Sequence, residues 1–280
     1  MRWWADNSEL NGIKEAEIPD ILMFGGIAVS DNAERELCIA VEAIKERYAD
    51  FARAPIKWNL KDLKEIYKKK EMNDTYNKLL GSAREWRMDV FQAIASVEST
   101  LIVACIECFS TKRDVLKQRK DDLARYVFTN GLMRFGLHVM KTKPPYAQVV
   151  LDWPDKGISK PFDTEYAYAY SSGKTADKQV TYKCGELCKL GFADSVYFTN
   201  MLHSTMLQIA DLVVGASREF IECCIGKKDA GQGLGCLRIV KDRFRGAPNN
   251  IFGRGLILPS GNQEFLSCVR AGIESKLNSA

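Results

Sequence analysis

The chain has 280 residues, of which 46% are hydrophobic and 27% charged, proportions typical of a folded globular protein rather than a disordered one. Its formal net charge of +4 permits contact with phosphate groups but is too small to require it. The longest apolar run, residues 21–29, is too short to cross a bilayer, which argues against an integral membrane protein.

The first part of the chain predicts two strands and a helix. Residues 2–6 are rich in tryptophan and end on a carboxylate. A fully apolar run at residues 21–30 is typical of a central strand. Its paired glycines, Gly25 and Gly26, indicate either a bulge or a close approach of another backbone. An apolar stripe then predicts a helix over residues 31–50.

The middle of the chain is mainly helical in pattern. Residues 57–70 and 75–95 both predict helices, and the first of these is basic. Residues 100–109 have the composition of an apolar strand. A long helix is expected over residues 112–141, where it ends before a pair of prolines.

The last part begins with a strand that also ends on a carboxylate, at residues 146–152. Residues 155–178 indicate an insertion or a surface helix, and one or two short extended pieces are expected within residues 185–199. A strongly apolar helix follows over residues 204–225. From about residue 227 a glycine-rich connector leads into a helical C-terminal extension.

Strands alternate with helices along most of the chain, which predicts an α/β domain with a mixed sheet flanked by helices and carrying helical insertions. No linker or internal repeat divides the sequence, so residues 1–280 are expected to form a single domain. The nine cysteines are irregularly placed and no apolar leader precedes them. Free thiols in a reducing compartment, and hence a cytoplasmic location, are therefore expected.

Two of the predicted strands deliver an aspartate at the carboxyl end, Asp6 and Asp152. Catalytic and ligand-binding groups collect at such ends in open α/β sheets. Aspartate is also common where a loop begins, so each residue taken singly is equally consistent with a simple turn.

A third acid lies in the apolar helix of residues 204–225. On a helix, Ser204, Gln208, Asp211, Gly215 and Arg218 fall on one narrow stripe. If the stripe is buried, Asp211 needs a metal ion, a cation or hydrogen-bond donors, because an isolated buried carboxylate is costly. The alternatives are that the stripe faces water or that Arg218 pairs with Asp211. Gly215 would let the helix pack closely over the sheet.

Acids on two strand ends and on one helix are what a centre for divalent cations requires. Mg²⁺ and Mn²⁺ take oxygen ligands from carboxylates. Two such ions about 4 Å apart can promote hydrolysis of a phosphodiester. The three aspartates are therefore candidate catalytic and metal-binding residues, with Ser204 and Gln208 as supporting residues.

Several segments resemble the domain-of-unknown-function 3800 family, which is regarded as related to the RNase H-like fold. Residues 4–9 read WADNSE where the family typically has a strand and Asp-Glu-Ser-Gly. Residues 24–29 read FGGIAV, matching a second strand with paired glycines, and residues 149–152 read VVLD. The most specific match is STMLQIADLVVGA at residues 204–216.

This resemblance implies an RNase H-like fold and a metal-dependent nuclease centred on Asp6, Asp152 and Asp211. Asn7 departs from the family pattern, because it stands where Glu is usual and offers a carbonyl oxygen without charge. Glu107, near the end of the strand at residues 100–109, is a possible additional metal ligand. The alternative is an inactive member that binds nucleic acid or protein within a bacterial or phage conflict system.

Two basic clusters are candidates for contact with nucleic-acid phosphates. They consist of Lys61, Lys64 and Lys68 in the first case and of Arg238, Lys241 and Arg243 in the second. A solvated helix face explains such clusters equally well. A protein partner or a second copy of the chain is also compatible with the sequence.

Overall fold

A six-stranded mixed sheet forms the centre of the molecule, whose computed structural model describes residues 1–8, 20–108, 113–152 and 159–277. The strands are β1 (Arg2–Asn7), β2 (Asp20–Val29), β3 (Ser99–Cys108), β4 (Gln148–Asp152), β5 (Tyr197–Thr199) and β6 (Leu256–Ile257). Their order in the sheet is β5-β4-β1-β2-β3-β6. β1, β2 and β3 form an antiparallel meander, β4 and β5 continue parallel to β1, and β6 runs parallel to β3.

The α-helices are α1 (Asp31–Ala49), α2 (Lys64–Lys69), α3 (Asn73–Gly81), α4 (Ala83–Ser96), α5 (Arg113–Thr142), α6 (Ser159–Ser172), α7 (Thr205–Cys224), α8 (Gln232–Val240) and α9 (Gln263–Gly272). Short 3₁₀ turns are η1 (Leu60–Leu63), η3 (Leu187–Leu190), η4 (Met201–His203) and η5 (Lys241–Arg243), and a π-helical turn, η6 (Ile273–Leu277), follows α9.

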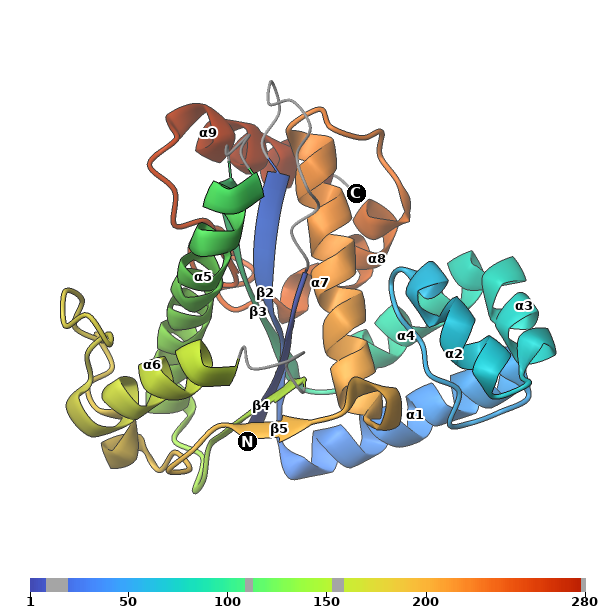
Figure 1. The fold of residues 1–280 in the computed structure, drawn as a ribbon, viewed down its shortest axis with the longest axis horizontal. Helices are drawn as coiled ribbons and strands as arrows, with labels where there is room; N and C mark the ends of the chain where they lie inside the picture. The colour runs from blue at the N-terminus through green and yellow to red at the C-terminus, as the bar shows by residue number, and fades with distance from the viewer. Residues whose placement is uncertain (9–19, 109–112, 153–158, 278–280) are drawn as a thin grey trace.

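Helices cover both faces of the sheet (Figure 1). On one face α5 and α6 pack over a core that includes Trp3, Phe24 and Phe128. On the other face α7 lies across the strands, with α1, α3, α4, α8 and α9 around it, and its core includes Leu37 and Phe220. This arrangement confirms the predicted α/β class with a mixed sheet flanked by helices.

Gly26, the second of the paired glycines of β2, permits a close approach of α7. β2 keeps an unbroken register with β1 and β3 through Gly25 and Gly26, so the chain has no bulge there. A Cβ atom at Gly26 would stand 2.9 Å from the Cβ of Ala210 in α7. Of the two predicted explanations, the close approach is therefore confirmed.

Three segments differ from the sequence-based expectation. Residues 57–59 are not helical, and the helical part of residues 57–70 begins at η1. The helix expected over residues 75–95 is divided into α3 and α4 at Ser82, whose backbone angles (φ −109°, ψ 23°) leave the helical region. The C-terminal extension is not wholly helical, since β6 pairs with Val103 and Ala104 at the sheet edge. None of the helices in the described ranges is both long and apolar enough to span a membrane.

Candidate functional site

Two of the three predicted aspartates project from adjacent strands toward α7. Ala5 pairs with Leu151 across β1 and β4, so Asp6 and Asp152 follow at the same level. Side chains alternate between the two faces of a strand, and those of Ala5 and Leu151 belong to the core beneath α5. Asp6 and Asp152 therefore point to the opposite face, which α7 covers.

Asp211 reaches this region from α7. Its Oδ2 atom accepts a hydrogen bond from the backbone N–H of Trp58, at a distance of 2.6 Å. The Oδ1 atom of Asp152 accepts one from the backbone N–H of Met201 at 2.8 Å, and that of Asp6 accepts one from the next backbone N–H along the chain, also at 2.8 Å. Each carboxylate is thus oriented by the main chain.

The three acids influence one another electrostatically. Asp6 is only 7% exposed. Burial, together with the negative charges of Asp211 and Asp152, raises the pKa of Asp6 to about 8. Burial also raises the pKa of Asp211 to about 6, although the charge of Lys57 and the Trp58 N–H act in the opposite direction. Negative charge therefore accumulates at a buried place and is only partly compensated, which is common at functional sites.

Lys57 is a cation that faces this acidic centre, and the sequence analysis missed it. Burial opposes its ionisation, but the charges of Asp211 and Asp6 outweigh burial and raise the pKa of Lys57. The acids Asp62 and Asp152 act in the same direction. No local signal could have identified this role, because the lysine and the acids are brought together by a contact between distant segments.

Gln208 and Asp211, one turn apart on α7, hold the segment that carries Lys57. The Oε1 atom of Gln208 accepts hydrogen bonds from the Lys45 ammonium (2.5 Å) and from the backbone N–H of Ile56 (3.4 Å). Its Nε2 atom donates to the carbonyl oxygen of Met201 (2.9 Å). Gln208 is 2% exposed and bonded at both ends of its amide, so it fixes the position of the segment around Ile56 relative to α7.

Gln208, Asp211 and Gly215 of the polar stripe of α7 contact the segment around Trp58. A Cβ atom at Gly215 would lie 2.2 Å from Cγ and 2.3 Å from Cβ of Trp58. The expectation that Gly215 brings α7 close to the sheet is therefore wrong, because Ala210 makes that approach and Gly215 accommodates a tryptophan. Ser204, the first residue of the stripe, caps α7 by accepting the N–H of Leu207 at 3.2 Å.

Other predicted residues lie apart from the acidic centre. Asn7 follows Asp6 at the end of β1 and is exposed. Glu107 is not brought to the centre: Val103 is the β3 residue level with Asp6, and Glu107 lies four residues farther, about 13 Å along the strand. Its carboxylate accepts a hydrogen bond from the hydroxyl of Ser260.

The two predicted basic clusters differ in whether their side chains are exposed or bonded to other parts of the chain. Lys61, Lys64 and Lys68 are exposed on η1 and α2. The guanidinium of Arg238 donates to the carbonyl oxygen of Lys276 at 2.7 and 2.9 Å. Arg243 donates to the carbonyl oxygen of Ala95 at 2.6 Å, and Lys241 is half-buried. The arginines of the second cluster are therefore engaged in holding the C-terminal segment.

A polar groove of about 880 Å³ opens beside Asp211 and follows α7. Its walls come from the end of β1, residues 57–62, α4 and α7. Charged side chains of both signs line it, among them Lys57, Asp62, Asp211, Arg218 and Glu222. A volume of this size can hold a ligand with several polar groups.

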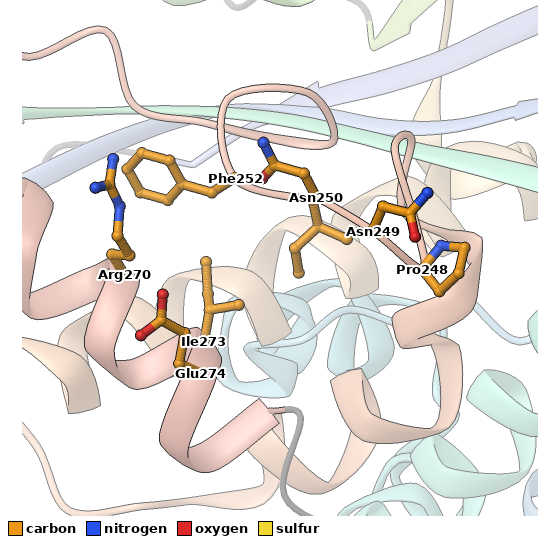
Figure 2. A pocket seen from close by; sticks show the side chains of 8 residues that line it. Pro248, Asn249, Asn250, Phe252, Arg270, Ile273 and Glu274 are labelled. Atoms are coloured by element: carbon orange, nitrogen blue, oxygen red, sulfur yellow. The ribbon is translucent and has the colours of Figure 1, made fainter.

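A second, smaller hollow of about 190 Å³ lies near the C-terminal helix and contains none of the predicted site residues. Figure 2 shows Arg270 and Phe252 side by side at its edge, with the guanidinium carbon 4.8 Å from the ring centroid. Glu274 is the carboxylate among its lining residues. A single acid beside a stacked arginine offers no grouping of catalytic side chains.

The acidic centre suits a hard cation by its donor chemistry. Within the described part of the chain, no three His, Cys, Asp or Glu side chains stand close enough to hold a metal ion as they are placed. The oxygen donors of Asp6, Asp152 and Asp211 are nevertheless of the type that Mg²⁺ and Mn²⁺ prefer. Their excess negative charge would favour such an ion, and the carboxylates would have to draw together around it.

Comparisons with protein-family models, with curated proteins and with solved structures find no match for this chain.

Proposed function

We propose that the chain is a divalent-metal-dependent phosphodiesterase that hydrolyses nucleic acid and has an RNase H-like fold. The observation that carries this proposal is the placement of Asp6 and Asp152 on the face of the sheet that α7 covers, with Asp211 on α7 itself. Acids on the ends of the adjacent parallel strands β1 and β4, joined by a third on the covering helix, also support the RNase H-like architecture.

Asp6, Asp152 and Asp211 would hold Mg²⁺ or Mn²⁺. When bound, these ions supply Lewis-acid polarisation of a phosphate group and lower the pKa of water. The chain contributes the orientation of its carboxylates, which the N–H groups of Trp58 and Met201 provide. Lys57 adds a positive charge at the same centre and can neutralise a phosphate oxygen once the acids are engaged by the ions.

Cleavage of labelled single- and double-stranded DNA and RNA with Mg²⁺ or Mn²⁺ tests the proposal. Asp211→Asn should abolish cleavage, because the amide can still accept the Trp58 N–H but brings no charge to the ions. Losing several kcal/mol of transition-state stabilisation corresponds to orders of magnitude in rate. Asn7→Glu should tighten Mn²⁺ binding and raise the rate, because Asn7 is exposed beside Asp6. Exposed Asp242, changed to Asn, provides the matched control.

Equal turnover by the wild type and Asp211→Asn would indicate a contaminating nuclease and would remove the support for the assignment. Cleavage that Asp242→Asn retains and Asp211→Asn loses is the expected pattern.

A second candidate function is that of a binding subunit without catalytic activity. The observation that favours it is Lys57, which already provides a positive charge to the acids, together with Asn7, which carries no charge. In that case nucleic acid should bind equally well with Mn²⁺ or with a chelator, and no variant should cleave it. Such a subunit could serve within a bacterial or phage conflict system.

A further inference from the structure

The groove beside Asp211 extends well beyond the acidic centre. Along α7 it passes Gly215 and reaches Arg218 and Glu222. Asp211 and Arg218 are seven residues apart, which corresponds to about 10 Å along a helix. The groove therefore has a near end at Asp211, the member of the acidic centre that lines it, and a far end about two helical turns away.

The far end carries a cluster of paired charges. Arg218 pairs with Asp20 at 2.8 Å and with Glu222 at 3.1 Å. Lys227 lies 3.1 Å from the same Asp20 oxygen, and Lys228 lies 2.5 Å from Glu222. Both acids are almost fully buried, whereas the side chain of Lys228 is 57% exposed. Among these ion-paired residues three cations meet two acids, and Glu219 adds a third carboxylate to the groove wall, so Lys228 offers an exposed ammonium that a phosphate can reach.

Trp58 supplies a rigid aromatic surface between the two ends. The backbone N–H of Trp58 donates to Asp211, and its backbone carbonyl oxygen accepts a hydrogen bond from the Arg87 guanidinium. The same guanidinium lies 4.6 Å from the centroid of the indole ring. Gly215 makes room for the side chain on α7. The indole is half-buried and lines the groove. Grooves that combine cations with fixed aromatic side chains are found in proteins that bind single-stranded nucleic acid, whose bases stack on the rings.

We propose that this groove binds a single strand of nucleic acid, with one phosphate at Lys228 and Arg218, a base against Trp58, and the phosphodiester to be cleaved at the three aspartates. The inference depends on the proposed function for the last of these contacts. It adds a substrate class, because a strand that reaches both ends of the groove must be an oligonucleotide rather than a mononucleotide.

Fluorescence anisotropy with a short labelled oligonucleotide tests the groove without any catalytic step. Binding is measured over a series of salt concentrations in the presence of a chelator. Each phosphate contact contributes about 0.7 to the salt-dependence slope for a single strand, so Lys228→Gln should lower the slope by about 0.7. Lys189→Gln is the matched control, because Lys189 is also an exposed lysine paired with a glutamate, Glu186, and lies outside the groove.

Trp58→Leu provides an independent arm and should weaken binding by about fivefold or more through the loss of base stacking. A slope that Lys228→Gln leaves at the wild-type value would overturn the inference, as would tighter binding of duplex than of single strand. Calorimetry with Mn²⁺ on the same proteins separates the two proposals. Intact Mn²⁺ binding with an unchanged slope removes only the groove, whereas a reduced slope without Mn²⁺ binding removes only the metal-dependent nuclease.

Discussion

Replacing Asp6 by Asn should stabilise the metal-free protein while removing its affinity for metal. The pKa of Asp6 is raised by burial and by two neighbouring carboxylates, so its ionised form is disfavoured in the folded state. The amide keeps the shape of the side chain and can still accept the backbone N–H that Asp6 accepts at 2.8 Å. It removes the charge that burial makes costly.

The size and the sign of this gain in stability follow from the shift in the pKa of Asp6. A change in pKa from 3.8 to about 8 corresponds to about 5–6 kcal/mol at high pH. Between about pH 4 and pH 8 the folded protein retains a proton that the unfolded chain has released, so the free energy of unfolding of the wild type falls as pH rises. The Asp6→Asn variant should not show this fall in the free energy of unfolding, because its amide does not titrate. Because Asp152 and Asp211 share the cost, we expect a gain of about 2–5 kcal/mol at pH 8 and less than about 1 kcal/mol at pH 4.

Thermal and urea unfolding in the presence of a chelator measure this difference. For a chain of this size about 2 °C accompanies each kcal/mol, so Asp6→Asn should melt about 4–10 °C higher at pH 8. Adding Mn²⁺ should raise the melting temperature of the wild type and leave that of the variant unchanged. Equal stability of the two proteins throughout this pH range would refute the claim that Asp6 is buried among uncompensated charges.

Three further predictions concern neighbouring residues. Gly215→Leu should lower the free energy of unfolding by about 1–3 kcal/mol, because the new side chain overlaps Trp58; an unchanged urea midpoint would contradict this. Burial lowers the pKa of Lys45 to about 8, so the wild type should gain stability as pH rises from about 8 to 10.5, and Lys45→Met should lack that gain in urea unfolding. Lys57→Gln should strengthen Mn²⁺ binding in calorimetry, because it removes a cation that competes for the same acids; weaker binding would argue against that competition.

Features that depend on local sequence pattern could be predicted from the sequence. The position of an aspartate at the end of each of two predicted strands was sufficient to anticipate that Asp6 and Asp152 lie on the same edge of the sheet. The apolar character of α7 likewise indicated a buried helix with Asp211 on its polar stripe. These elements are long or strongly patterned, and their sequence signals are correspondingly clear.

What could not be predicted depends on contacts between distant segments. A helical stripe shows which face is polar but not what covers it, so the contact between Asp211 and Trp58 and the role of Lys57 were missed. Glu107 was considered a ligand from its place near a strand end, yet the antiparallel pairing of β2 with β3 carries it away from Asp6. The two-residue strand β6 is too short to leave a periodic signal.

Calorimetric titration with Mn²⁺ at pH 8 tests the central claim most directly. The wild type and Asp242→Asn are expected to bind with a saturable heat, whereas Asp6→Asn, which stays folded, should show none. Absence of saturable binding by the wild type, or undiminished binding by Asp6→Asn, would contradict the account that Asp6, Asp152 and Asp211 form a metal centre.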